Sequence, residues 1–189
     1  MNITETHLKG CFIIEPDIFG DDRGYFFESY NQQKFEKLTG LKITFVQDNQ
    51  SCSQRGVLRG LHIQTGKYAQ AKLVRVIKGS VLDVVVDIRL GSATFGQPFS
   101  IELSEKNNKQ LFVPRGFAHG FSVLENETIF AYKCDNYYNK VAESGIIYND
   151  AELNIDWMLQ PHEIILSSKD KELKNLDNLR KKMKYAKPE

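Results

Sequence analysis

The sequence predicts an all-β protein, a sandwich or barrel of short strands with a few short helices at its periphery. Between residues 42 and 135, short apolar or β-branched runs follow one another, and the breaks between them carry Gly, Pro, Asn or Ser. No long helical pattern separates these runs, which argues against a parallel α/β sheet. The expected strands are Ile43–Gln47, Val57–His62, Lys72–Ile77, Val81–Ile88, Phe99–Leu103, Gln110–Val113, Phe117–Val123 and Thr128–Asp135.

The segments on either side of this β region carry other signals. Upstream, short apolar runs flank Phe19–Gly24, where two aspartates next to glycines predict a turn between strands. Downstream, residues 169–189 are rich in charge and carry leucines at near-helical spacing. This spacing predicts a surface helix or a loose tail that packs along one narrow apolar stripe.

A short helix is expected over Asn31–Leu38. Asn31 can cap its first turn, and Gly40 is suited to its end. Phe35 and Leu38 fall on one face of such a helix and form its apolar side.

Length and charge narrow the class of protein. A chain of 189 residues is most simply one domain, residues 1–189, and it is long enough to bury a core. Its 25 Lys and Arg residues are balanced by 24 Asp and Glu residues, which argues against a broadly basic surface that binds nucleic acid. No apolar run reaches transmembrane length, and the first residues lack the pattern of a signal peptide, so we expect no membrane association.

The cysteines indicate a reducing compartment. Cys11, Cys52 and Cys134 are widely spaced and odd in number, and no Cys-x-x-Cys pair is present. Neither a zinc knuckle nor a disulfide framework is therefore expected. We interpret the three residues as small hydrophobic side chains of a cytoplasmic protein.

One expected strand carries both a basic residue and a histidine. Because side chains of a strand alternate between its faces, His62 should share a face with Leu58 and Gly60, while Arg59 and Leu61 point to the other. Gly60 has no side chain and should leave room for a ligand beside His62. We interpret this strand as the floor of an active site.

Acid–base chemistry fits these residues best. Histidine is the side chain whose ordinary pKa lies nearest neutral pH, so His62 can take a proton from a carbon beside a carbonyl group. Lys72 can stabilise the resulting enolate oxygen, and Gln47, Asp48 and Asn49 can orient the substrate. A histidine taken alone more often has a structural role. The catalytic interpretation depends on the charged and polar residues that accompany His62.

A metal site is the alternative interpretation for histidines in a small β-barrel. A cupin-type site uses two histidines one residue apart and a carboxylate, so that alternate strand positions converge on one ion. His62 is followed by Ile63 and Gln64, so this pair is missing, although a second-half pattern survives in Pro114–His119. We therefore expect no functional metal.

Three further polar positions leave alternatives open. Asp83 and Asp87 lie on the same face of a buried strand, and either can touch the site or pair with an arginine, Arg75 or Arg89. Tyr132 can offer its phenol as an acid, although barrel tyrosines are more often packing residues with a tethered hydroxyl.

Several blocks of the sequence resemble the successive signatures of the dTDP-4-dehydrorhamnose 3,5-epimerase family. They follow in order over nearly the whole chain, from about Gly10 to Leu176. The blocks are Phe19–Phe26, Phe45–Ser51, Arg55–His62, Val113–Phe121 and Ile165–Asp170.

The resemblance implies a cupin-type jelly-roll barrel that works as a homodimer without metal or cofactor. The implied substrate is a dTDP-linked 4-keto-6-deoxyhexose, which is epimerised at C3 and C5 on the way to dTDP-L-rhamnose. In this family's terms His62 is the base and Asp170 orients it. Lys72 holds the C4 oxygen, and Tyr132 returns a proton from the opposite face.

The resemblance also implies a set of residues that bind the substrate. They are Arg59 and His119 at the sugar and diphosphate, Gln47, Asp48 and Asn49 at the nucleotide, Tyr138 on the thymine ring, Arg23 and Glu28 from the partner subunit, and Glu143 and Lys169 completing the site.

The chain departs from the family in the loop Thr65–Ala71, which lacks the prolines expected there and ends in Ala71 where glycine is usual. This loop directly precedes Lys72, so the sugar pocket can differ. Three alternatives stay open: a mono-epimerase, a 3,4-ketoisomerase on a related nucleotide-linked 4-keto-6-deoxy sugar, and a non-catalytic cupin that binds a nucleotide sugar.

Overall fold

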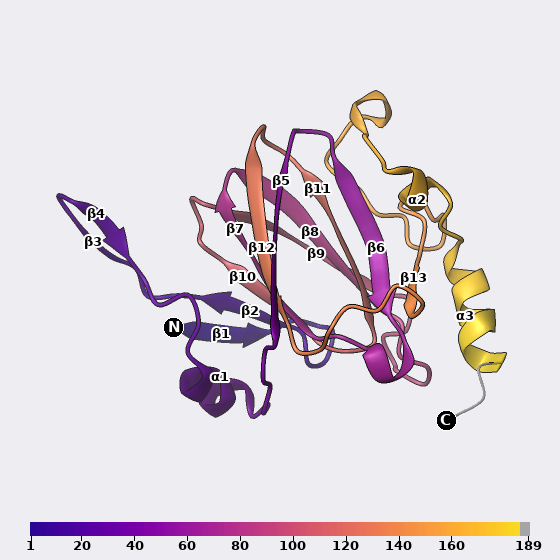
Figure 1. The fold of residues 1–189 in the computed structure, drawn as a ribbon, viewed down its shortest axis with the longest axis horizontal. Coiled ribbons are helices and arrows are strands. Elements are labelled where there is room, and N and C mark those ends of the chain that lie inside the picture. Colours follow the sequence, from indigo (N-terminus) through magenta and orange to yellow (C-terminus); the bar gives the residue numbers. More distant parts are fainter. Residues whose placement is uncertain (186–189) are drawn as a thin grey trace.

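Two antiparallel β-sheets face each other in the structure, a computed structural model that describes residues 1–185 (Figure 1). The six-stranded sheet has the order β1 (Asn2–Glu5), β2 (Phe12–Glu15), β10 (Gln110–Val113), β7 (Lys72–Lys78), β12 (Thr128–Cys134) and β5 (Gln47–Ser53). The five-stranded sheet has the order β13 (Glu143–Gly145), β6 (Leu58–Gln64), β11 (Phe117–Val123), β8 (Ser80–Asp87) and β9 (Pro98–Ser104). This is a cupin-type jelly roll, and the predicted all-β fold is confirmed.

Short helices and one hairpin lie outside the sheets. Strands β3 (Phe19–Asp21) and β4 (Gly24–Phe26) pair with each other and form a hairpin that projects from the body of the molecule (Figure 1). None of the described helices is long and apolar enough to cross a membrane. The helices are α1 (Gln32–Thr39), the 3-10 turns Gly66–Tyr68 and Pro161–Glu163, α2 (Ser168–Lys171) and α3 (Leu176–Tyr185).

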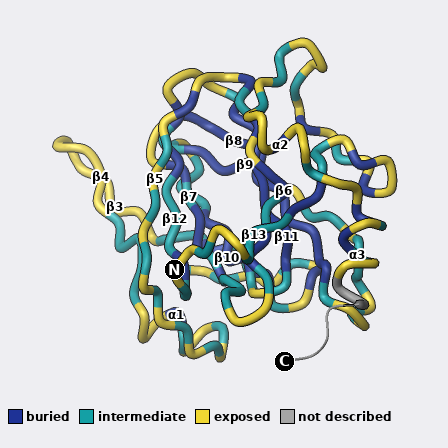
Figure 2. Tube along the Cα trace, turned by 45° about the vertical axis from the view of Figure 1, so that its right-hand side comes forward, coloured by how far each residue is buried: buried dark blue, intermediate teal, exposed yellow. Residues whose placement is uncertain are grey.

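Strand β8 shows why the centre of the fold is buried on both sides. Its inward residues Val81 and Val85 belong to the core between the sheets, where they meet residues of β7, β11 and β12. Its outward residues Val84 and Val86 pack under the C-terminal region, which covers the outer face of the five-stranded sheet. Figure 2 shows this centre as buried and the hairpin as exposed. A β-branched run suits such a doubly covered strand.

Helix α1 begins and ends as its sequence predicts. The Asn31 side chain accepts a hydrogen bond from the backbone N–H of Lys34 at 3.1 Å, and Gly40 adopts a φ of 73° at the end of the helix. The expected apolar face is only half correct, because Phe35 is buried whereas Leu38 is 50% exposed. The helix contacts the core through one side chain.

One expected strand is in the wrong place. The sequence predicts Ile43–Gln47, but the strand that pairs with β12 is β5, which begins at Gln47. Ile43 and Phe45 instead pack against Phe35 and its neighbours before the strand begins. Apolar residues mark burial, whereas β5 is a largely polar edge strand held by its backbone ladder.

The C-terminal region contains two helices separated by an irregular stretch. Helix α3 packs Leu176 and Leu179 into the cluster that covers the outer face of the five-stranded sheet. The last part of the expected tail, residues 186–189, lies outside the described residues. The docked region also positions α2, which carries one residue of the site described below.

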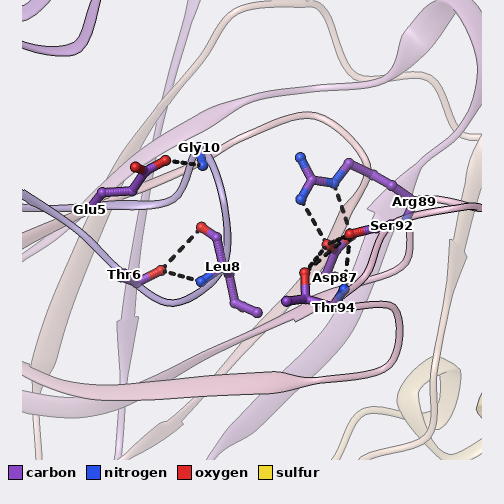
Figure 3. A network of polar contacts seen from close by, with 8 residues as sticks. All are labelled: Glu5, Thr6, Leu8, Gly10, Asp87, Arg89, Ser92 and Thr94. Atoms are coloured by element: carbon purple, nitrogen blue, oxygen red, sulfur yellow. Dashed lines mark hydrogen bonds and ion pairs between the residues drawn. The ribbon is translucent and has the colours of Figure 1, made fainter.

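A polar network supports the end of strand β8 (Figure 3). Asp87 accepts hydrogen bonds from Arg89 Nη2 at 2.7 Å, Ser92 Oγ at 2.6 Å and Thr94 Oγ1 at 2.7 Å. Burial raises the pKa of Asp87, but these donors outweigh it and lower the pKa to about 2. Asp87 therefore pairs with Arg89, one of the alternatives that the sequence left open, and it serves the fold.

Candidate active site

Two adjoining cavities, of about 300 and 140 Å³, lie between strands of the two sheets. Both are lined by His62 from the five-stranded sheet and by Asn49, Lys72 and Tyr132 from the six-stranded sheet. An imidazole on one side of the space thus faces an ammonium group and a phenol on the other. The barrel fold produces this opposition because its inner faces are formed by different strands.

A bulge in β6 changes the expected order of its side chains. His62 pairs with His119, but Arg59 pairs with Phe121, so β6 has one residue more than β11 between these pairs. Such a bulge reverses the alternation of side chains. Arg59 and His62 therefore line the same cavity, while Leu61 joins the outer apolar cluster. The predicted separation of Arg59 from His62 is wrong.

Gly60 lies in this bulge and has a different role from the one expected. It has a φ of 115°, and a Cβ atom there would approach the Cα atom of Gly120 to 2.6 Å. The missing side chain lets β6 and β11 approach closely, so it serves strand packing and leaves no space for a ligand.

His62 is paired with a carboxylate from the C-terminal region. Its Nε2 atom lies 2.5 Å from Oδ1 of Asp170, while the Ser167 hydroxyl donates to Oδ2 of Asp170 at 2.6 Å. Burial raises the pKa of Asp170, but the hydrogen bonds from His62 and Ser167 outweigh it and hold the pKa below its usual range. The residue is thus a carboxylate that fixes the orientation of the imidazole ring.

Lys72 and Tyr132 lie next to each other on adjacent strands β7 and β12. The Lys72 Nζ atom is 5.9 Å from the centre of the Tyr132 ring. Burial lowers the pKa of Lys72 and raises the pKa of Tyr132. The phenol therefore keeps its proton at neutral pH and is available as an acid.

A second histidine lines the larger cavity. His119 Nε2 lies 2.9 Å from Oδ2 and 3.1 Å from Oδ1 of Asp83, which is fully buried. Burial lowers the pKa of His119, so the ring is neutral at pH 7. Asp83 thus touches the site through His119, which settles the alternatives that the sequence left open.

Residues near the mouth of the smaller cavity form a connected group. The Tyr138 hydroxyl donates to Glu143 at 2.7 Å, and Lys169 forms an ion pair with the same carboxylate. Gln47 accepts the backbone N–H of Tyr138 at 3.1 Å and donates to Asn49 at 3.1 Å. Burial raises the pKa of Glu143, but the contacts with Lys169 and Tyr138 lower it overall.

Asp48 does not lie in this group. It is on the outer face of β5 between Gln47 and Asn49, and its carboxylate pairs with Lys133 at 3.0 Å. Strand alternation places it on the opposite face of the sheet, so within this chain it does not line either cavity.

The comparison with known proteins decides the family. The family model described as dTDP-4-dehydrorhamnose 3,5-epimerase matches residues 5–178. The dTDP-4-dehydrorhamnose 3,5-epimerase of Escherichia coli K12 is 50% identical over 179 residues, which cover 95% of this chain and 96% of that protein. This chain belongs to the dTDP-4-dehydrorhamnose 3,5-epimerase family.

Solved structures of the epimerase family agree with the fold. The dTDP-4-dehydrorhamnose 3,5-epimerase of Elizabethkingia anophelis has a TM-score of 0.91 and 54% identity, covering 94% of this chain and 97% of that one. The enzyme of Legionella pneumophila, in complex with dTDP-4-keto-L-rhamnose, has a TM-score of 0.92 and 49% identity, covering 96% of each chain. The resemblance read from the sequence blocks is therefore confirmed.

Two residues that the epimerase family implies lie away from the cavities of this chain. Arg23 is at the tip of the projecting hairpin, with its side chain 88% exposed, and it pairs with Asp21. Glu28 follows the hairpin and pairs with Lys34 at 2.8 Å. Neither lines the cavities around His62.

The described residues contain no group of three His, Cys, Asp or Glu side chains placed to hold a metal ion. Each histidine of the cavity has a single carboxylate partner, Asp170 for His62 and Asp83 for His119. These pairs serve to orient imidazole rings.

Two residues of the site, Ser167 and Asp83, are not assigned by the sequence patterns. Ser167 stands three residues before Asp170, the spacing at which a serine can cap a short helix and hold an acidic side chain, so this signal was available. Asp83 interrupts an otherwise apolar run, which indicates a buried partner. The identity of that partner depends on the pairing of β8 with β11.

Proposed function

We propose that this protein epimerises dTDP-4-keto-6-deoxy-D-glucose at C3 and C5, giving dTDP-4-keto-L-rhamnose in dTDP-L-rhamnose biosynthesis. One observation supports this above all: the paired imidazole of His62 stands across the cavity from Lys72 and Tyr132. Inversion requires proton removal on one face of a carbon and proton return on the other. The opposed sheets supply a group for each face.

In the proposed first step His62 takes the proton. Its Nε2–H donates to Asp170, so Nδ1 carries the free lone pair that accepts a proton from C3 or C5. Asp170 holds the ring in this tautomer and stabilises the imidazolium that forms. The substrate's C4 ketone acidifies the hydrogens on both neighbouring carbons, so one base serves both centres.

Lys72 and Tyr132 act on the other side of the resulting enolate. The ammonium group of Lys72 stabilises the negative C4 oxygen where that charge develops. Tyr132 returns a proton to the face opposite His62 and so completes the inversion. After each inversion His62 carries an extra proton and Tyr132 lacks one, and proton exchange with solvent restores both groups. Because burial raises the pKa of the phenol, Tyr132 starts the next cycle in its protonated form.

The remaining residues bind the nucleotide and sugar in this proposal. Arg59 contacts the diphosphate from the larger cavity, where a guanidinium group suits phosphate oxygens. Tyr138 stacks on thymine, and Gln47, Asn49, Glu143 and Lys169 surround it at the mouth.

We further propose that two copies of the chain form a homodimer that completes the site. The hairpin leaves Phe19, Tyr25 and Phe26 exposed by 65, 60 and 70%, which is unusual for aromatic side chains and typical of an interaction surface. A hairpin inserted into a second copy would bring Arg23 and Glu28 to the substrate of that copy.

The three cysteines form no disulfide, which supports a reducing compartment such as the cytoplasm.

Solvent exchange tests the proposed reaction. With dTDP-4-keto-6-deoxy-D-glucose in heavy water, deuterium should enter at both C3 and C5. His62→Ala should abolish exchange at both centres. Tyr132→Phe should retain exchange but reduce inversion, because the base still removes a proton while the acid is missing.

Other results would point to the alternatives. Exchange at one centre alone indicates a mono-epimerase, and a product whose carbonyl has moved to C3 indicates a 3,4-ketoisomerase. Binding of the nucleotide sugar without any exchange indicates a binding protein. Full activity in His62→Ala would overturn the mechanism.

A further inference from the structure

We infer that Asp135 is a positioning residue for the proposed reaction. Together with Arg115 it closes the sheet over the end of β7 and so sets the position of Lys72. The inference rests on the proposed function, because Lys72 is the group that faces the C4 oxygen there. Its basis is a set of hydrogen bonds that join three connecting segments of the chain, residues 65–71, 114–116 and 135–138.

The ammonium group of Lys72 is not held by contacts of its own. Among the described residues Nζ has no hydrogen-bond or ion-pair partner, and it lies 5.9 Å from the centre of the Tyr132 ring. Lys72 is also the first residue of β7, and the ends of strands open more readily than their centres. The position of the ammonium group therefore depends on how firmly the backbone is held at this end of β7.

Asp135 extends the pairing of β7 with β12 by one residue. The last pair of this ladder joins Lys72 to Cys134. Directly beyond it, the backbone N–H of Asp135 donates to the carbonyl oxygen of Ala71 at 3.1 Å, and the backbone N–H of Ala71 donates to Oδ1 of Asp135 at 2.6 Å. Ala71 is 1% exposed, so its N–H depends on this carboxylate for a partner.

Arg115 holds the other oxygen of the same carboxylate from the opposite side of β7. Strand β7 lies between β12 and β10, and Lys72 pairs with Val113 of β10. Arg115 follows β10 in the turn to β11, and its Nε atom donates to Oδ2 of Asp135 at 2.8 Å. The Asp135 side chain is only 7% exposed. The ion pair thus joins the two neighbours of β7 across its end, next to Lys72.

The next residue, Asn136, fastens the loop that leads into β7. Its carbonyl oxygen accepts from Gln70 Nε2 at 2.7 Å, and its side chain donates to the carbonyl oxygen of Lys67 at 2.9 Å. Gln70 lines the smaller cavity together with Lys72, so this contact also holds part of the cavity wall. The loop that departs from the family pattern is therefore held at the end that adjoins the site.

Asp135→Ala tests the inference. It removes both contacts of the carboxylate and leaves the Ala71 N–H without a partner, so β7 should open at its first residues. Lys72 acts where charge develops on the C4 oxygen, and a displaced group costs rate more than binding. We expect kcat to fall about tenfold, with KM within about threefold of the wild-type value. Deuterium uptake at C3 and C5 gives the rate.

Asp135→Asn gives a graded comparison. Its amide oxygen can still accept from Ala71, but the ion pair with Arg115 is lost. We expect kcat to fall about threefold, again with little change in KM, because an ion pair to a partly exposed arginine contributes about 1 kcal/mol or less.

Asp87→Ala is the matched control. Asp87 also lies at a strand end, and its carboxylate also accepts from a backbone N–H and a guanidinium group, both of Arg89, at 3.0 and 2.7 Å. It does not line the cavities around His62. The change should lower the urea concentration at which the protein unfolds and keep kcat within about twofold of the wild-type value.

A double-mutant cycle separates positioning of Lys72 from a general loosening of the fold. In Lys72→Met the ammonium group is absent, and NMR follows the residual deuterium uptake over hours. In that background Asp135→Ala should cost less than about twofold, because the group that it displaces is missing.

Three results would overturn the inference: an unchanged kcat in Asp135→Ala, a rise in KM without a fall in kcat, or the same loss in the Lys72→Met background as in the wild-type background. A loss of kcat in Asp87→Ala as large as that in Asp135→Ala would overturn it as well. If Asp135→Ala does not fold, the same comparisons are made with Asp135→Asn. If the wild-type protein takes up no deuterium, the proposed function itself fails, and this outcome is distinct from the others.

Discussion

The two histidine–aspartate pairs of the cavity are built in different ways. His62 pairs with Asp170, which lies 108 residues away on a helix docked from outside the barrel, and the histidine side chain is 28% exposed. His119 pairs with Asp83, 36 residues away on the neighbouring strand, and its side chain is only 6% exposed. One pair joins two parts of the fold, while the other belongs to a single sheet.

This difference separates two tasks. A base must reach its substrate and hold a proton for part of the cycle, which suits the more accessible ring of His62. A ring that takes no part in proton transfer gains from being held still and neutral, and burial between adjacent strands provides both for His119. In the proposed reaction, the same two residue types thus serve proton transfer at one place and substrate binding at the other.

Among changes to the aspartates of the two pairs, the largest effect is expected for Asp170→Asn. The amide oxygen can still accept from His62, but the charge that stabilises the imidazolium is lost, and kcat should fall roughly 10³-fold. The corresponding change of Asp83 should cost only about tenfold, because its partner His119 takes no proton in the proposed reaction and the amide oxygen can still accept from the ring. Steady-state rates of the two variants measure the contrast directly. Equal losses would show that the pairs do the same work.

The third buried aspartate, Asp87, contributes to stability and not to the site, so its variant can be compared with those of the two pairs. Asp87→Asn should lower the free energy of unfolding by about 2 kcal/mol at neutral pH, since the pKa of Asp87 is lowered from 3.8 to about 2 in the folded protein. A pKa that is lower in the folded than in the unfolded state stabilises the folded protein at pH values above the unfolded-state pKa. The loss of stability in Asp87→Asn should therefore be complete above about pH 5 and shrink as pH falls from 4 towards 2. Urea unfolding at several pH values checks this.

The smallest effect is expected where the C-terminal region is attached to the barrel. Arg55 pairs with Glu163 at 3.0 Å and donates to the carbonyl oxygen of Leu124 at 2.7 Å. Arg55→Ala should loosen the segment that carries Asp170 and reduce kcat about threefold, because partly exposed ion pairs contribute about 1 kcal/mol or less.

The matched control for this variant is Lys109→Ala, which removes a partly exposed pair with Glu15 on β2 of the six-stranded sheet. Amide hydrogen exchange should be faster over residues 165–170 in Arg55→Ala and unchanged on β11, where His119 lies. Faster exchange on β11 would mean that the two pairs are not independently supported.

Much of this protein could be predicted from local patterns. The strands from β6 to β12 and the cap at Asn31 follow from residues close together in the chain. The pairing of Asp87 with Arg89 was one of several alternatives that the sequence left open. Strand β5 begins later than the sequence predicts, because Ile43 and Phe45 are buried against Phe35 of α1 and not in a strand ladder. Hydrophobic side chains indicate that a segment is buried, whereas a strand is defined by its backbone pairing with a neighbouring strand.

The sequence by itself determined the β class, the family and most of the residue types that meet in the cavity, because these depend on composition, spacing and motif. Tertiary structure alone decided that Arg59 and His62 share a face and that Asp83 reaches His119. A one-residue bulge and the choice of neighbouring strands set those contacts. Both depend on how distant segments pair, and no local pattern records that pairing.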